Sequence, residues 1–155
     1  MDIRIAAYGV IIRDGQILLS HWNEHGRSGW TLPGGGIEEA EHPVAAAKRE
    51  IFEETGYEAS IDQLLGIDTM VVPAARRHSG TDPLYAMRIV YRATVVAGEL
   101  RNEVGGSSDE ARWFPVAEVP RLHRVSLLDI GLRLNEAEPA DGVAPPAPPA
   151  TPAED

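Results

Sequence analysis

The amino-acid sequence predicts an α+β domain, in which strands and helices are mixed without a strict βαβ alternation. Its 155 residues have the length of one domain with a substantial core. Hydrophobic residues make up 43% of the chain, which is enough to fill such a core. Apolar runs rich in β-branched residues, separated by runs with helical spacing, set the expected order of elements.

The first part of the chain is expected to be mostly extended. Residues 3–20 should form two strands joined by a tight turn at Asp14-Gly15. The polar stretch HWNEHGRSG, residues 21–29, is then expected to be a loop. WTLPGGGIEE, residues 30–39, should also be a loop, because one proline and three glycines disfavour a helix.

A helix over residues 43–55 follows, since Pro43 suits a first helical turn and Gly56 suits the residue that ends a helix. The extended pattern then returns, most clearly in LYAMRIVYRATVV, whose β-branched and aromatic residues favour a strand. The remaining expected elements are strands at 66–73, 84–96 and 111–114, a helical turn after Pro115, and a helix at 126–134.

The C-terminal stretch EAEPADGVAPPAPPATPAED is rich in proline and alanine and is acidic. Val143 is its single aliphatic residue larger than alanine, so the stretch buries too little to offset its ordering entropy. We therefore expect a domain over residues 1–134 and a largely disordered tail over residues 135–155. The tail is either dispensable or a docking or linker segment.

Composition excludes several classes of protein. The chain has no cysteine, which rules out disulfides, thiolate metal sites and a cysteine nucleophile. Its net charge of −10 argues against a surface that tracks duplex nucleic acid. No window approaches the roughly 18–20 apolar residues of a membrane span, and the first residues lack the pattern of a signal peptide. We expect a cytoplasmic protein that does not bind membranes.

The predicted helix carries three glutamates at spacings of three and four, Glu50, Glu53 and Glu54. Like charges at such spacings weaken a helix by about a few tenths of a kcal/mol per pair. On a helical wheel the glutamates form an arc beside an apolar stripe of Val44, Ala45, Ala47, Ile51 and Phe52. Two interpretations are open: an acidic flank beside the core, or a site for a hard divalent cation such as Mg²⁺, which favours oxygen ligands.

The residues around this helix have a specific spacing. In chain order they are Gly35, Glu41, Arg49-Glu50, Glu53-Glu54, Gly56 and Tyr57. This pattern resembles the Nudix box, G-x5-E-x7-R-E-U-x-E-E-x-G-U, where U is a bulky apolar residue. Tyr57 is the one residue that departs from the usual pattern, since an aliphatic residue is commoner at this last position of the motif. The similarity extends over about residues 3–122, through GVIIRDGQILLS, WTLPGG and SSDEARWFPVAEVPRL.

The resemblance implies a Nudix-type α/β/α sandwich around a mixed β-sheet. It also implies a pyrophosphohydrolase that requires Mg²⁺ or Mn²⁺ and cleaves a nucleoside diphosphate linked to another moiety. The implied metal ligands are a backbone carbonyl near Gly34 and the side chains of Glu50, Glu53 and Glu54. Arg49 would orient these glutamates by ion pairing, and Gly35 and Glu41 would support the geometry of the loop and the helix.

The group that accepts the proton of the attacking water is left open. It is either a box glutamate, Glu53 or Glu54, or a glutamate of the downstream stretch NEVGGSSDE. Within that stretch Glu110 is favoured over Glu103.

Substrate contacts are expected from two loops and one strand, with arginines for phosphates and aromatic rings for a base. The side chains favoured for these contacts are Trp22, Arg27, Arg76 and Tyr85. Further candidates are His21, His25, Arg77 and His78, and each has a plain surface or packing role as its alternative. Trp30 and Trp113 are assigned to the core.

Two other functions remain open at this stage. A catalytically silent Nudix-fold module would sense a nucleotide or bind a protein, but such modules usually lack box glutamates. An unrelated acidic domain would require the spacing to be a coincidence. The expected partner is a small-molecule nucleotide or nucleotide sugar, and the resemblance also allows a homodimer.

Overall fold

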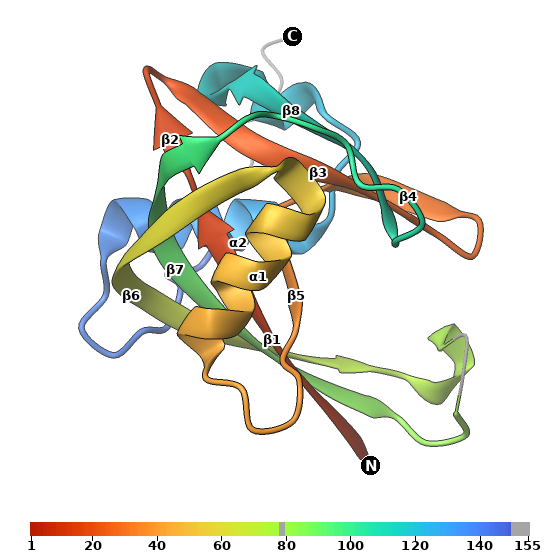
Figure 1. The fold of residues 1–155 in the computed structure, drawn as a ribbon. Coiled ribbons are helices and arrows are strands. Elements are labelled where there is room, and N and C mark those ends of the chain that lie inside the picture. The colour runs from red at the N-terminus through yellow and green to blue at the C-terminus, as the bar shows by residue number, and fades with distance from the viewer. Residues whose placement is uncertain (78–79, 150–155) are drawn as a thin grey trace, which may run out of the picture.

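The computed structural model describes residues 1–77 and 80–149, which form two β-sheets with a helix packed on each face of the larger sheet (Figure 1). The elements are, in chain order, β1 (Asp2–Val10), β2 (Ile12–Arg13), β3 (Gln16–Glu24), β4 (Arg27–Thr31), β5 (Gly34–Gly36), α1 (Pro43–Thr55), β6 (Tyr57–Val72), the 3₁₀ turn η1 (Ala74–Arg76), β7 (Leu84–Gly98), β8 (Ser108–Pro115), the 3₁₀ turn η2 (Val116–Arg121) and α2 (Ser126–Ala137).

The larger sheet has the strand order β5-β1-β7-β6. Within it β1 runs parallel to β7, whereas the other neighbouring strands are antiparallel. The smaller sheet has the order β2-β3-β4, and β8 pairs with β3. Mixed pairing without repeated βαβ units confirms the predicted α+β class.

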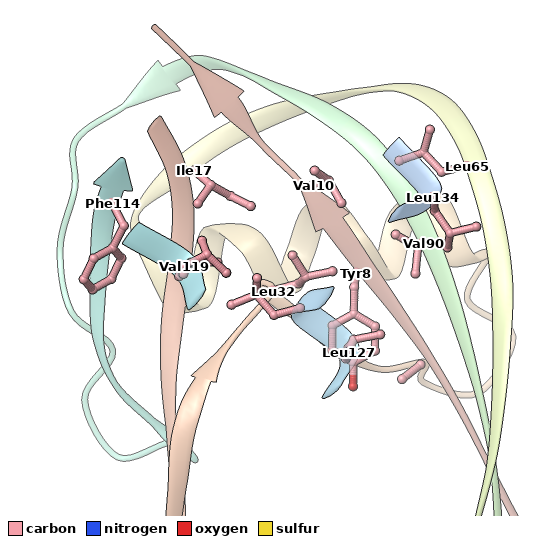
Figure 2. Packing of buried hydrophobic residues seen from close by; sticks show 13 residues of the cluster. Tyr8, Val10, Ile17, Leu32, Leu65, Val90, Phe114, Val119, Leu127 and Leu134 are labelled. Atoms are coloured by element: carbon pink, nitrogen blue, oxygen red, sulfur yellow. The ribbon is translucent and has the colours of Figure 1, made fainter. Parts of the chain in front are cut away.

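The main core lies between the two sheets and α2. Figure 2 shows its buried side chains, among them Val10 from β1, Ile17 from β3, Val90 from β7 and Leu127 from α2. On the other face of the larger sheet, Ala46 and Ala47 of α1 pack against Ala7 and Tyr91 in the layer that joins α1 to the sheet. Because successive strand residues point to opposite faces, β1 contributes to both layers.

Helix α1 has the predicted bounds. His42 precedes it and its side chain accepts a hydrogen bond from the Val44 amide at 3.0 Å, while Gly56 ends the helix with a φ of 81°. The predicted apolar stripe was wrong at Phe52, which is 44% exposed and lies under the Arg101 guanidinium at 5.0 Å. Ala45 is also exposed. None of the described helices is long and apolar enough to cross a membrane.

Residues 21–29 were wrongly predicted to be a loop. β3 continues to Glu24 and pairs with β4, and the two strands are joined by a tight turn at His25-Gly26 with φ values of 51° and 75°. The polar side chains fit this hairpin because it projects from the body and needs no apolar face. Part of the predicted glycine-rich loop is likewise a strand, since β5 pairs with β1.

Strand β6 begins at Tyr57 rather than near residue 66, and it follows β7 through several register shifts. Its early part was missed although residues 57–62 alternate between apolar and polar side chains, as a half-buried strand does. The end of the β6–β7 hairpin projects from the body as a long arm, and β1 remains paired with β7 as far as Asp2 (Figure 1).

The first half of the predicted tail is packed against the sheet. Helix α2 runs to Ala137, and the carbonyl oxygen of Gly142 accepts a hydrogen bond from the Ile67 amide at 2.9 Å. Ala144 contacts the main core. This packing requires close approach of two backbones, because a Cβ on Gly66 would lie 2.4 Å from that same carbonyl oxygen. Residues 150–155 lie outside the described part of the chain.

Candidate active site

A cleft of about 1110 Å³ opens between the β3–β4 hairpin and the arm of β6 and β7. The strand β5 and two carboxylates of α1, Glu50 and Glu54, line it, together with the first residues of α2. The positive end of the α2 dipole therefore faces the same space as the carboxylates. Figure 1 shows the elements that carry these residues, the two projecting hairpins and α1 with β5 beside it.

Glu54 is the most buried of the box glutamates, with 7% of its surface exposed. Its Oε2 accepts a hydrogen bond from the Gly34 amide at 3.0 Å, and the Ser20 side chain donates to the same carboxylate. Burial raises the pKa of Glu54 to about 8, and the charges of Glu50 and Glu103 add to this effect. Such a carboxylate is costly to ionise until a cation reaches it.

The glycine strand makes room for these carboxylates. A Cβ on Gly35 would lie 2.8 Å from the Glu50 carboxyl carbon, so any larger residue would displace that side chain. Gly34 has a φ of 151°, and a Cβ there would lie 2.3 Å from the Ala7 carbonyl oxygen. Both positions therefore require glycine, for space at Gly35 and for space and conformation at Gly34.

Arg49 fastens the helix to the loop before it. Its Nε and Nη2 donate to the two oxygens of Glu41, each at 2.9 Å, and Nη2 also donates to the Gly36 carbonyl oxygen at 3.1 Å. Nη1 donates to Glu50 Oε1 at 2.8 Å. Arg49 and the Glu38 amide together lower the pKa of Glu41 to about 2. The predicted ion pairing is present, and it sets the orientation of the Glu50 side chain.

Glu53 is placed differently from its two neighbours. It is about half exposed, lies 3.4 Å from Arg49 Nη1 and does not line the cleft. Within residues 1–77 and 80–149, no three carboxylate or histidine side chains form a ready-made metal cage. The side chains that meet at the floor of the cleft are therefore Glu50 and Glu54.

This donor set suits Mg²⁺ or Mn²⁺. Mg²⁺ in proteins typically takes one or two carboxylates and completes its shell with substrate phosphates and water. Glu50 and Glu54 supply the carboxylates, and the glycines of β5 line the same cleft beside them. In the described chain, the buried hydroxyl of Ser108, which also lines the cleft, has no hydrogen-bond partner. A bound water or substrate atom would satisfy it.

The two downstream glutamates differ sharply. Burial and the charges of Glu50 and Glu53 raise the pKa of Glu103, which also accepts a hydrogen bond from the Ser108 amide. Glu110 instead forms an ion pair with Arg112 on β8, and neither glutamate lines the cleft. The structure therefore brings Glu103, rather than the favoured Glu110, toward the box glutamates.

Three of the four favoured substrate residues, Trp22, Arg27 and Arg76, line the cleft. Tyr85 does not, although its neighbour Leu84 on β7 does. The side chain that sequence reasoning missed is Arg4 on β1, which also lines the cleft. Its spacing of two and four from buried Ala6 and Tyr8 would have placed it on their face.

The further candidates divide in the same way. His25 and Arg77 line the cleft, whereas His21 lies 2.8 Å from Asp109 on the neighbouring strand and its ring packs against Trp30. His78 lies outside the described residues. The two tryptophans assigned to the core, Trp30 and Trp113, are half-buried against core clusters.

Comparison with known proteins places the chain in a family. A model of the NUDIX domain matches residues 3–130. The chain is similar to a putative mutator protein, MutT4, of Mycobacterium tuberculosis, with 36% identity over 149 residues that cover 90% of this chain and 57% of the relative. It is also similar to an ADP-ribose pyrophosphatase of Methanocaldococcus jannaschii, with 33% identity over 119 residues that cover 76% of this chain and 65% of that protein. The chain thus spans less than two thirds of the length of these relatives.

Solved structures show the same fold. A NUDIX hydrolase from Nitrosomonas europaea superimposes with a TM-score of 0.74 at 22% identity, covering 88% of this chain and 90% of that one. A MutT NUDIX hydrolase from Burkholderia pseudomallei gives a TM-score of 0.69 at 26% identity, with 85% and 97% covered. The predicted sandwich around a mixed sheet is confirmed. The family model and the relatives match most of this chain, and Glu50 and Glu54 of the box line its cleft. This chain therefore belongs to the Nudix family.

Proposed function

We propose that this chain is a divalent-metal-dependent pyrophosphohydrolase that cleaves a nucleoside diphosphate linked to another moiety. The observation that carries this proposal is the buried, hydrogen-bonded Glu54 beside Glu50 at the floor of a large cleft. The named activities of the relatives, an ADP-ribose pyrophosphatase among them, support the same reaction class. Nucleotide substrates accord with a cytoplasmic location, which we include in the proposal.

Glu50 and Glu54 would hold the cation, with Glu53 as a further ligand directly or through water, and a main-chain oxygen near Gly34 would complete the protein ligands. The bound cation would neutralise charge on the phosphoryl oxygens as the reaction proceeds. Arg49 keeps Glu50 oriented through its bonds to the glutamate and to Gly36. The cost of placing several carboxylates together is thereby partly offset before any substrate arrives.

The proton of the attacking water would pass to Glu103. The water oxygen forms a bond to one phosphorus, the bond from that phosphorus to the bridging oxygen breaks, and the carboxylate of Glu103 takes the proton. Its position beside Glu50 and Glu53 supports this role. Glu53 is the alternative acceptor, whereas the Glu110 carboxylate is paired with Arg112.

The walls of the cleft supply groups for a nucleotide. Trp22 offers an aromatic face for a base, and Arg27 and Arg76 offer guanidinium groups for phosphates. The sizes of the cleft and of a nucleotide are compatible, since small-molecule sites commonly enclose about 300–1,000 Å³.

The test is hydrolysis of a panel of nucleotides and nucleotide sugars with Mg²⁺, with Mn²⁺ and with a chelator, with both phosphorus-containing products identified. We expect metal-dependent cleavage of at least one compound and its loss in Glu54→Gln. Glu58→Gln is the matched control, because Glu58 is an exposed acid of β6 outside the cleft. Nucleotide binding without turnover would contradict the proposal and favour a silent nucleotide-sensing module.

A further inference from the structure

The arm of β1, β6 and β7 has two faces of different chemistry. Its cleft side carries charged side chains, among them Arg4 and the ion pair of Arg88 with Asp68. The residues that alternate with these form the other side, which we call the outer face. Level by level along the paired strands, it consists of Ile3, Tyr85 and Val71, then Ile5, Met87 and Thr69, then Ile89 and Ile67. No side chain of this set is charged.

The outer face is apolar and exposed at the same time. Four of its aliphatic side chains are between 41% and 67% exposed, namely Ile3, Ile5, Ile67 and Val71. The β3–β4 hairpin also projects from the body, and its side chains are polar, as suits a strand pair in water. A contiguous apolar patch on a projecting element is typical of a surface that is covered in a complex.

The same side of the sheet already accepts a helix. Further along the strands, Ala46 and Ala47 of α1 pack against Ala7 of β1 and Tyr91 of β7. This cover ends where α1 begins, at Pro43, and the arm continues past that end (Figure 1). The outer face is therefore the uncovered continuation of a surface on which a helix is packed.

A groove with an acidic wall borders the outer face. It has a volume of about 520 Å³ and lies between the strands β1 and β7 and the loop before α1. The loop contributes two exposed glutamates, Glu38 and Glu39, and also Glu41, whose oxygens are both bound by Arg49. None of the described residues that line the groove is basic. The groove thus complements a ligand that combines apolar and cationic side chains.

The dimensions of the outer face favour one helix over a second copy of the chain. Three strands and three levels give a planar area on the order of 300 Å². A stable interface between two proteins buries roughly 800 Å² on each partner. Two chains that each have a net charge of −10 also repel each other. A helix about 10 Å across matches the width of three strands.

We propose that the outer face is a docking site for an amphipathic helix of a partner protein. The apolar stripe of that helix packs on Ile5, Met87 and Ile67, and its lysine or arginine side chains lie beside Glu38 and Glu39. None of these five residues lines the cleft, so the docking site is separate from the proposed hydrolase function.

Two synthetic peptides of about 18 residues, long enough to form a helix, serve as probes. They share one stripe of leucine and alanine, which lysines flank in the first peptide and glutamates in the second. Binding to the full chain is measured by fluorescence anisotropy for the natural protein, Ile5→Gln and Ile67→Gln. Val96→Gln is the matched control, because Val96 is 62% exposed on β7 and lines neither the cleft nor the groove. Glu39→Gln tests the acidic wall, with Glu58→Gln as its control.

We expect the lysine peptide to bind at least about tenfold more tightly than the glutamate peptide. Ile5→Gln and Ile67→Gln should each weaken its binding about tenfold, since each variant removes a buried aliphatic contact. Val96→Gln and Glu58→Gln should leave binding unchanged, and Glu39→Gln should weaken it. Absence of binding, equal binding of the two peptides, or binding that persists in Ile5→Gln and Ile67→Gln would overturn the inference.

Two other occupants of the outer face are separate outcomes. Sedimentation velocity detects a second copy, and a dimer that Ile5→Gln dissociates would overturn the inference. Co-sedimentation with phosphatidylcholine–phosphatidylglycerol vesicles detects a membrane, and vesicle binding that Ile5→Gln abolishes would overturn it as well. Thermal unfolding of each variant shows that it is folded.

Discussion

The buried carboxyl of Glu54 should make the metal-free protein less stable as the pH rises. The unfolded chain loses the proton of this group near the ordinary value of 4.5, whereas the folded chain keeps it until a pH of about 8. Between those values the folded state binds more protons than the unfolded state. The free energy of unfolding therefore falls with increasing pH across this window and levels off above it.

The size of the effect follows from the same two values. Each unit of pKa difference corresponds to about 1.4 kcal/mol. The titration of Glu54 should therefore lower the free energy of unfolding by at most about 4 kcal/mol at pH 9 relative to pH 4.5. For a chain of this length, one kcal/mol shifts the melting temperature by roughly 2–4 °C. A change on the order of 10 °C is therefore expected from this single group.

The assay is thermal unfolding in a chelator from pH 5 to pH 9, followed for the natural chain and for Glu54→Gln. Other groups also titrate, so the informative quantity is the difference between the two proteins. The variant should be the more stable of the two at pH 9, and Mg²⁺ should stabilise the natural chain far more. If the difference in melting temperature between the two proteins did not change with pH, Glu54 could not be a buried carboxyl whose ionisation destabilises the metal-free protein.

Three further variants test other parts of the structure. Arg49→Lys should reduce turnover at least about tenfold with little change in fold by circular dichroism, because lysine cannot donate two parallel hydrogen bonds to Glu41. Leu128→Ala, at a fully buried side chain, should cost about 2–5 kcal/mol in urea unfolding; a loss below about 1 kcal/mol would contradict the core assignment. Gly66→Ala should separate the C-terminal segment from β6, because the new Cβ meets the Gly142 carbonyl oxygen; faster proteolysis after α2 would show it, and unchanged protection would refute it.

The helix and its ion pairs could be predicted because a local spacing specifies them. Pro43 and Gly56 fix the ends of α1, and the interval from Glu41 to Arg49 brings their side chains together. Such information lies within a short segment and does not depend on the rest of the fold.

The walls of the cleft could not be predicted in the same way. The strand residues that line the cleft depend on the pairing of strands far apart in the sequence, as where Leu84 of β7 lies between Asp2 of β1 and Val72 of β6. The choice between Glu103 and Glu110 depends on the path of a loop, and the sequence of that loop has no periodic pattern. Arg4 was missed because an exposed arginine on a first strand is usually a solvated residue.

The arrangement of charges suggests how reaction and selectivity are divided in this cleft. Glu50 and Glu54 of α1 lie beside the glycine strand. Arg49 donates hydrogen bonds to Glu50 and to the Gly36 carbonyl oxygen, and the Gly34 amide donates one to Glu54. Arg76 lines the same cleft from another element, the turn η1 that follows β6. Replacing Glu54 should therefore abolish cation binding for every nucleotide alike, whereas replacing Arg76, which is not among the groups expected to hold the cation, should leave the affinity for the cation intact.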